Sequence, residues 1–459
     1  MSIEAPRPES PPPTLIVNAR LVNEGREFDA DLRIGSDGRI AEIAPGLAAR
    51  AGETVFDAAG RRLLPGMIDD QVHFREPGLE HKGDLATESA AAVAGGLTSF
   101  MEMPNTSPPT LNRAALDDKY RRAQGRAWGN YAFYMGTSTG NIDDIRAIDP
   151  LTTPGVKIFM GASTGNMLVD DPEVLNMVFR DAPTPIITHC EDTPMIDAEL
   201  AKYREKYGDD IPVEFHGEIR NRAACIKSTK LAIELARRHD ARLHVLHIST
   251  ADELALFERG PLVRADGSRK RITAETCVHF LRFDARDYAT RGNFIKCNPA
   301  IKNPSDREAI VRALADDVLD VLATDHAPHT LEEKSAGYLR APSGLPLVQF
   351  ALNAALECVH EGTLTLHQVV QKFAHASAQL FDVKDRGFLR EGYFADLVLI
   401  EDRPYTVRRE DVLSKCGWSP FEGFTFRSRI ASTWVNGHRV WDGERLVGQA
   451  RGMRLEFDR

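Results

Sequence analysis

The stretch GMIDDQVHFREPG, residues 66–78, runs from apolar residues through acidic ones to His73, Arg75 and a Pro-Gly turn. This order is typical of a strand that carries polar side chains into an active site. Gln71 and His73 lie two positions apart, so on a regular strand they face the same side. A metal site at this place usually has histidine at both positions. The stretch therefore predicts a strand that leads into a site and has one unusual residue there.

Seven further segments combine a short apolar strand with a polar end, and helical stretches lie between them. Eight strand–helix units over about 300 residues fit an α/β protein with a TIM (β/α)8 barrel. A doubly wound sheet is the alternative, but it needs fewer strands, and no GxGxxG follows the first strand. The seven segments are LTSFMEMPNT (97–106), YAFYMGTS (131–138), VKIFMGAS (156–163), PIITHCED (185–192), RLHVLHIST (242–250), RITAETCVHF (271–280) and VLDVLATDHAPH (318–329).

Both ends of the chain have a different pattern, in which Gly, Asn-Gly or Asp-Gly turns separate short strands. We predict one small β-sandwich domain built from residues 14–64 plus 387–459, around a barrel of residues 65–386. Two unrelated β-ribbons are the alternative. Residues 1–13 are rich in proline and predict a disordered lead-in.

Composition restricts the class of protein. The chain has 459 residues, and its net charge of −10 gives no indication of a nucleic acid or an anionic membrane surface as a partner. Its six cysteines are scattered without a CxxC pair, as expected for reduced thiols. The N-terminus lacks the apolar core of a secretory signal, and no apolar run approaches the roughly 20 residues of a membrane span. We expect a soluble cytoplasmic protein that acts on a small molecule.

Ligand-type residues end almost every predicted strand. In a (β/α)8 barrel these strand ends converge on one mouth, where the chemistry takes place. A single histidine there is more often structural, but repetition over several strands favours a shared site. The residues are His73, Asn105, Lys157, His189, His247, His279, Asp325 and His326.

Four of these residues indicate metal chemistry. Lys157 has apolar neighbours, so a buried ammonium is unfavourable, whereas a neutral amine can take up carbon dioxide and bridge two metal ions as a carbamate. His189 and His247 come from neighbouring strands, as in a zinc site. His244 is expected to face the opposite side and to be structural. Asp325 can both bind a metal and accept a proton from water, although capping a helix is its alternative role.

Taken together, these motifs resemble the dihydroorotases of the amidohydrolase superfamily. The resemblance rests on IDDQVHFREPG, MEMPNT, VKIFMGAS, THCED, LHIST, CNPAIK and ATDHAPHTLEEK, with SGLPLVQ and GFLREGYFADLVLIE further on. It extends from about residue 14 to the C-terminus. It implies one or two metal ions, commonly zinc, and an N-carboxylated lysine. The implied ligands are His73, Lys157, His189, His247 and Asp325.

The resemblance also implies a reaction, the reversible hydrolysis of dihydroorotate to N-carbamoyl-aspartate in pyrimidine biosynthesis. Asp325 would accept the proton of the attacking water and pass it to the ring nitrogen. Arg75 would bind the substrate carboxylate, because a guanidinium is its best bidentate partner. Asn105, Asn298 and His329 would be further substrate contacts.

Arg75 bears on the choice of substrate. Allantoinases and hydantoinases share the barrel and metal site but usually lack this arginine, and they are the alternative function. A salt bridge from Arg75 to Glu76 or Glu80 is the alternative role of the side chain.

Two residues depart from the family pattern. Gln71 replaces the first histidine of the His-x-His pair, and Asp70 stands where proline is common. On a regular strand Gln71 and His73 face one side and Asp70 the other, so Asp70 is not expected to replace the ligand. The amide oxygen of glutamine suits zinc less well than imidazole. We therefore expect one weakened metal position in a working enzyme.

Family likeness further implies a homodimer. A non-catalytic scaffold beside a transcarbamoylase is the alternative to an enzyme. Retention of the other implied ligands and of Arg75 favours the enzyme.

Overall fold

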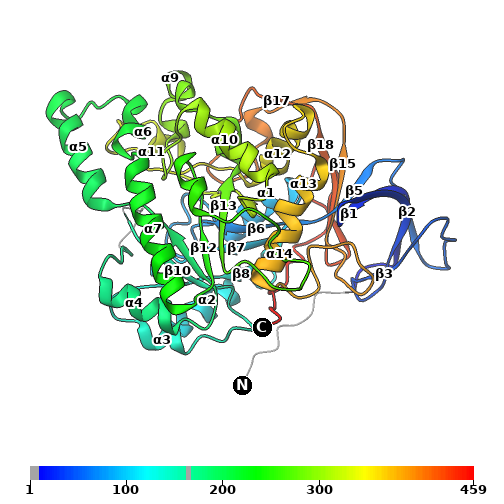
Figure 1. Cartoon of the computed structure of the whole chain (residues 1–459). Helices are drawn as coiled ribbons and strands as arrows, with labels where there is room; N and C mark the ends of the chain where they lie inside the picture. Colours follow the sequence, from blue (N-terminus) through cyan, green and yellow to red (C-terminus); the bar gives the residue numbers. More distant parts are fainter. Residues whose placement is uncertain (1–9, 162–166) are drawn as a thin grey trace.

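A TIM barrel forms the centre of the molecule in the computed structural model, which describes residues 10–161 and 167–459 (Figure 1). Six of its strands pair in parallel in the order β14 to β9, and β6, β7 and β8 form a second parallel sheet. β8 and β9 are pieces of one strand separated by Tyr134, and His73 N donates to His326 O (2.7 Å) to join β6 to the end of β14. The strands are β6 (Met67–Val72), β7 (Leu97–Glu102), β8 (Asn130–Phe133), β9 (Met135–Gly136), β10 (Val156–Phe159), β11 (Ile186–His189), β12 (Leu243–Val245), β13 (Ile272–Cys277) and β14 (Val321–Ala323).

Helices follow the strands and cover the outside of the barrel (Figure 1). Local sequence sets where they begin: the Asp84 carboxylate accepts from Ala86 N and Thr87 N at the start of α1. None of the helices in the described ranges is long and apolar enough to cross a membrane. The helices are α1 (Leu85–Ala94), α2 (Arg113–Ala123), α3 (Ile142–Arg146), α4 (Pro172–Asp181), α5 (Thr193–Tyr207), α6 (His216–Ile219), α7 (Arg222–His239), α8 (Val278–Arg282), α9 (Tyr288–Arg291), α10 (Pro304–Ala315), α11 (Leu331–Lys334), α12 (Ala351–His360), α13 (Leu366–Val370) and α14 (Ala376–Phe381).

An apolar cluster fills the barrel interior below its mouth. Its residues in and between the strands come from opposite sides of the ring and can meet only inside it: Ile68, Met101, Tyr134, Ile187 and Val321. Phe381 of α14 and the C-terminal residues Leu455 and Phe457 belong to the same cluster. The end of the chain is therefore part of the barrel core.

Backbone hydrogen bonds fix this C-terminal segment. Tyr131 N of β8 donates to Met453 O, and Leu455 N donates back to Tyr131 O, both at 2.9 Å. Phe457 N donates to Leu151 O (3.1 Å). Residues more than 300 positions apart in the chain thus close the lower end of the barrel.

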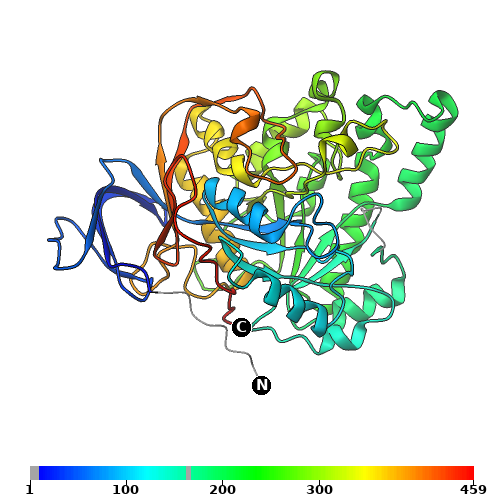
Figure 2. The same ribbon diagram turned by 180° about the vertical axis from the view of Figure 1, so that it is seen from behind.

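Both chain ends form one eight-stranded sheet beside the barrel, and Figure 2 shows the N-terminal and C-terminal strands side by side. β5 pairs antiparallel with β15, with Leu64 opposite Val398, which joins the two ends. The Asn436-Gly437 turn between β18 and β19 has positive φ at both residues, as a tight hairpin requires. The strands are β1 (Thr14–Asn23), β2 (Arg26–Ile34), β3 (Ile40–Ala44), β4 (Thr54–Asp57), β5 (Arg62–Pro65), β15 (Leu397–Glu401), β18 (Arg429–Val435) and β19 (His438–Trp441), with β16 (Tyr405–Thr406) and β17 (Thr425–Phe426) as a separate pair.

The predicted fold class, an α/β TIM barrel with a β domain built from both ends, is confirmed. The exact domain boundaries stay a prediction. Of the predicted disordered lead-in, residues 1–9 lie outside the described residues, whereas Pro13 O accepts from Thr54 N at 2.9 Å.

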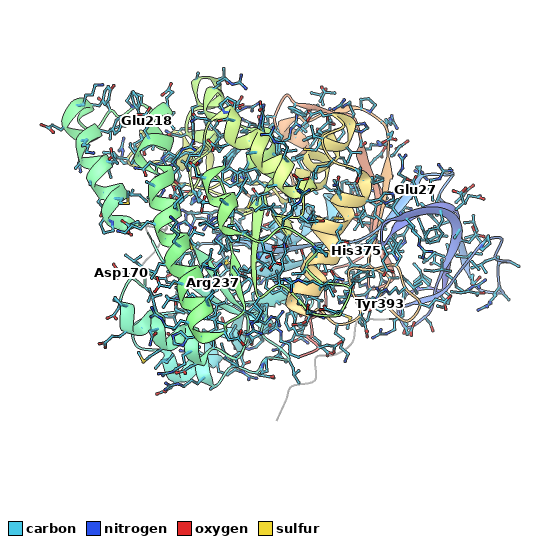
Figure 3. The ribbon with its side chains drawn as sticks, in the orientation of Figure 1. Glu27, Asp170, Glu218, Arg237, His375 and Tyr393 are labelled. Atoms are coloured by element: carbon cyan, nitrogen blue, oxygen red, sulfur yellow. The ribbon has the colours of Figure 1, made fainter. Side chains whose placement is uncertain are left out.

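A buried histidine links the β domain to the barrel. His375, labelled in Figure 3, accepts a hydrogen bond from Glu24 N at its Nε2 (3.0 Å). Its Nδ1 donates to Gly387 O (2.7 Å), and its ring stacks on Phe388. The turn between β1 and β2 is therefore attached to the helical layer.

Candidate active site

A cavity at the barrel mouth, with about 390 Å³ of empty space, collects most of the residues that the sequence predicts for the site. Asn105 and His329 do not line it but contact residues that do. The lining residues are Gln71, His73, Arg75, Lys157, Phe159, His189, His247, Asn298, Asp325, Ala327, Ser343 and Gly344.

Two histidines face each other in this cavity. His189 Nδ1 lies 3.0 Å from His247 Nε2, and both rings are buried. On the other side of its ring, His189 Nε2 is 3.0 Å from Glu191 Oε2, which in turn pairs with Arg220. Burial lowers the pKa of both histidines, so both imidazoles are neutral near pH 7. Two neutral ring nitrogens at this separation fit the donor set of a divalent cation.

Lys157 is 1% exposed, and burial lowers the pKa of its amine to about 7. No carboxylate lies within 4.0 Å of its Nζ in the part of the chain that the structure describes, and the Phe159 ring lies 4.7 Å away. A large fraction of the amine is therefore neutral near pH 7, the form that takes up carbon dioxide.

His73 and Asp325 form the opposite side of the cavity. His73 Nδ1 donates to Asn105 Oδ1 (2.7 Å), which leaves the lone pair of Nε2 directed at Asp325 Oδ1, 3.2 Å away. Two acceptor atoms at this distance also fit ligands of one cation. Asn105, predicted as a substrate contact, orients His73 in this way.

Gln71 takes part in this arrangement as a hydrogen-bond donor. Its Nε2 donates to Asp325 Oδ1 (3.1 Å), and its Oε1 accepts from Cys277 Sγ (3.8 Å). The amide oxygen is therefore directed away from Asp325. A histidine at position 71 would instead present a ring nitrogen toward Asp325.

Gln71→His is expected to increase the zinc content per chain, because the imidazole supplies the missing ligand beside His73 and Asp325. The increase in affinity at this position should be on the order of 10–100-fold. Zinc measured by mass spectrometry after dialysis against graded zinc buffers checks this. Gln71→Leu, which offers no ligand atom, is the control and should match the parent. Unchanged zinc content in Gln71→His would contradict the account of a weakened position.

Arg75 is a buried cation with no directly paired carboxylate among the described residues. It is 4% exposed, and no carboxylate lies within 4.0 Å of its guanidinium among the described residues. Its Nε donates to Pro328 O (3.1 Å), and its Nη2 lies 3.1 Å from His329 Nε2. Burial lowers its pKa to about 10, so it still carries its charge at neutral pH.

The alternative salt bridge of Arg75 with Glu76 or Glu80 does not form. Glu76 pairs instead with Arg126 (2.7 Å) and Arg122 (3.4 Å). The charge of Arg75 therefore remains available to an anionic group in the cavity.

The backbone of the site is strained. Arg75, His247 and Asp325 have φ angles of 73°, 40° and 51°, in the left-handed region that favours glycine. Such strain concentrates at functional sites, where the fold holds a side chain in a particular direction. No sequence pattern indicated it.

Two of the predicted strand-end histidines do not line the cavity. His326 is fully buried, with Nε2 donating to Glu88 Oε2 (2.9 Å) and Nδ1 accepting from Leu347 N (2.9 Å). His279 lies on α8 against Phe280. His326 therefore has a structural role between the barrel and α1.

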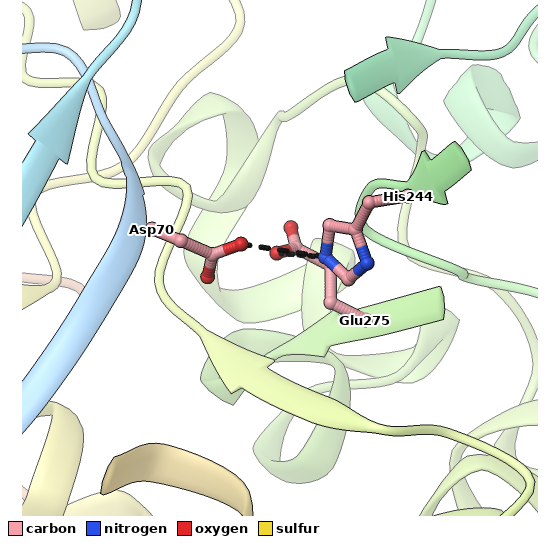
Figure 4. Close-up of side chains that lie close together, drawn as sticks. All are labelled: Asp70, His244 and Glu275. Atoms are coloured by element: carbon pink, nitrogen blue, oxygen red, sulfur yellow. Dashed lines mark hydrogen bonds and ion pairs between the residues drawn. The ribbon is translucent and has the colours of Figure 1, made fainter. Parts of the chain in front are cut away.

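Strand alternation was wrong for Asp70 and His244. Both point into the barrel interior, where they meet Glu275 (Figure 4). The pairing of β6 with β7 shifts register between Asp69 and Val72, so Asp70 and Gln71 both face inward. The left-handed backbone at His247 likewise breaks the alternation that separated it from His244.

The chain is similar to known hydrolases over nearly its whole length. A model of the amidohydrolase family matches residues 62–440. The chain is 35% identical over 424 residues to a dihydroorotase from Halobacterium salinarum, covering 89% of this chain and 95% of the relative. It is 30% identical over 452 residues to an allantoinase from Bacillus velezensis, covering 96% and 97%. The solved structure of an L-hydantoinase from Arthrobacter aurescens matches with a TM-score of 0.90 and 26% identity, over 97% of this chain and 100% of the other.

Proposed function

The chain belongs to the amidohydrolase family and is a hydrolase, and from this premise we propose that it is a dihydroorotase. The proposed reaction is the reversible hydrolysis of the ring amide of dihydroorotate to N-carbamoyl-aspartate, a step of pyrimidine biosynthesis. The observation that carries this choice is the buried, unpaired Arg75 in the wall of the cavity. A substrate carboxylate would supply the direct ion pair that no described carboxylate makes with Arg75.

We also propose that the site holds one or two zinc ions. The ligands would be His73, a carboxylated Lys157, His189, His247 and Asp325, a set whose nitrogen and oxygen donors fit zinc. A bound cation would polarise the ring carbonyl and make water nucleophilic near neutral pH.

The side chains of the site would transfer the proton and bind the substrate. Asp325 accepts the proton that water loses as its oxygen bonds to the ring carbonyl carbon, and returns that proton to the ring nitrogen as the carbon–nitrogen bond breaks. Arg75 holds the carboxylate and so fixes the ring in the cavity. Asn298 Oδ1 is buried without a hydrogen bond among the described residues and can accept from a ring N–H. His329 would hold Arg75 in place through its contact with the guanidinium.

Turnover of dihydroorotate, allantoin and hydantoin by zinc-loaded protein tests the proposed function. We expect dihydroorotate to be hydrolysed with the highest kcat/KM, and N-carbamoyl-aspartate to cyclise in the reverse assay. Protein stripped by a chelator and then resupplied with zinc is the control for metal dependence. Turnover confined to allantoin or hydantoin would overturn the substrate, and no turnover of any of the three would overturn the proposal as a whole.

Carboxylation of Lys157 is expected to increase with pH. A pKa of about 7 leaves the amine mainly protonated at pH 6 and mainly neutral at pH 8. The neutral amine combines with carbon dioxide to give a carbamate and release one proton, so the carbamate fraction rises through this range. Carbon-13 NMR of metal-free protein in labelled bicarbonate measures it, with Lys157→Arg as the control. A carbamate signal that is absent at pH 8, or that also occurs in Lys157→Arg, would contradict this assignment.

We further propose a cytoplasmic homodimer. All six cysteines are free and all but Cys416 are buried, which suits a reducing compartment. A transcarbamoylase partner stays a prediction from family likeness.

A further inference from the structure

A second cluster of ligand-type side chains lies inside the barrel, outside the candidate active site. It consists of Asp70 on β6, His244 on β12 and Glu275 on β13, each at most 1% exposed (Figure 4). His244 Nε2 lies 3.2 Å from Glu275 Oε2 and 3.3 Å from Asp70 Oδ2. None of the three lines the cavity at the mouth.

The ring of His244 is held in one orientation. Its Nδ1 lies 2.9 Å from Thr273 Oγ1, and that hydroxyl donates its own hydrogen to Leu243 O (3.1 Å). Thr273 Oγ1 must therefore accept from His244 Nδ1, and Nε2 is the nitrogen that faces the two carboxylates. A metal-binding imidazole is typically oriented in this way by a hydrogen bond on its other nitrogen.

Asp70 lacks the hydrogen bonds that a buried carboxylate normally accepts, whereas Glu275 accepts from His247 N (3.2 Å) and pairs with His244. Neither oxygen of Asp70 accepts a hydrogen bond from any described residue, and both are fully buried. Two ionised carboxylates buried beside one imidazole are unfavourable unless protons or a cation neutralise them, and a divalent cation would balance both.

The distances also fit a cation. Ligands about 2.0–2.1 Å from a tetrahedral zinc ion lie about 3.3 Å from one another. The two nitrogen–oxygen distances of 3.2 and 3.3 Å match this value.

We propose that Asp70, His244 and Glu275 bind a divalent cation of the zinc type inside the barrel. Glu275 connects this position to the active site, because its Oε1 accepts from His247 N (3.2 Å). The cation would therefore stabilise the left-handed backbone that presents the His247 ring to the cavity.

Protons are the competing occupants of the cluster. Burial lowers the pKa of His244, but the neighbouring Asp70 and Glu275 carboxylates outweigh it and raise the pKa to about 9. The experiment must therefore locate a metal rather than record a titration.

Anomalous diffraction at the zinc edge, on crystals of the full chain soaked in zinc chloride, locates bound metal directly. We expect a peak among the three side chains, separate from any peak between His189 and His247. Asp70→Asn keeps the shape of the side chain but removes its charge, so the interior peak should disappear and zinc content should fall by one equivalent per chain. No interior peak in the parent, or full zinc content in Asp70→Asn, would overturn the proposal.

Matched variants separate this outcome from misfolding. Asp69→Asn changes the neighbouring buried acid, which accepts from Thr324 Oγ1 outside the cluster, and should retain the interior peak. Glu275→Gln provides a second loss variant if Asp70→Asn does not fold, and circular dichroism reports folding of all three. If the proposed function fails, turnover or the peak at His189 and His247 is absent while the interior peak remains.

Discussion

Arg75→Met is expected to reduce kcat/KM for dihydroorotate by about 10²–10³-fold, because it removes the buried partner of the substrate carboxylate. The fold should not be weakened, since Arg75 has no directly paired carboxylate among the described residues and its burial is unfavourable in the free protein. Steady-state kinetics with dihydroorotate and thermal unfolding of the same sample measure the two effects. Activity should fall while Tm stays constant or rises by a few degrees.

Arg126→Lys is the matched control for this result. Arg126 is also close to the first barrel strand, but it pairs with Glu76 and does not line the cavity. Its replacement should leave kcat/KM near the parent value. Equal losses in both variants, or a large fall of Tm in Arg75→Met, would mean that Arg75 has a structural role only.

Asp325→Asn should reduce kcat by about 10²–10⁴-fold, the range for the loss of a general acid–base group. KM should change little, because Asp325 is not the group that holds the substrate carboxylate. The amide oxygen of asparagine can still accept from Gln71 Nε2, so the geometry around His73 is retained. Steady-state kinetics in both reaction directions measure the effect, which should be equal in both since the same proton is transferred.

Zinc content distinguishes a lost proton carrier from a lost ligand. If Asp325→Asn binds as much zinc as the parent and kcat falls, the proton-transfer role is supported. Restoration of kcat by excess zinc would show that Asp325 acts mainly through the metal. His247→Ala is the comparison variant in which a loss of zinc is expected.

The barrel could be predicted from the sequence because its signals are local. Each strand is a short apolar run with a polar end, and helical stretches separate the runs, so order and number follow without knowledge of contacts. Pairing of the two chain ends was also predictable, because strands of the same turn-rich pattern occur at both ends and each needs a partner. The resemblance to known motifs then predicted the roles of the residues at the strand ends.

The directions of individual side chains were less predictable. Alternation along a strand assumes a regular backbone, and β6 departs from it between Asp69 and Val72. For that reason the sequence placed Asp70 on the wrong face and gave no indication of its contact with His244. The surroundings of Arg75 could not be predicted either, because its hydrogen-bond partners Pro328 and His329 lie about 250 positions away in the chain.

The seal formed by Leu455 and Phe457 has a consequence for how the molecule is made. A ribosome releases the first barrel strand long before it adds these residues, so the lower end of the barrel stays open during most of synthesis. The sheet of the β domain also forms late, since β5 can pair with β15 only after more than 300 further residues have been synthesised. Contacts this distant in sequence make folding slow and leave apolar surface exposed meanwhile. Nascent chains that pause before residue 455 should therefore depend on chaperones more than the finished protein does.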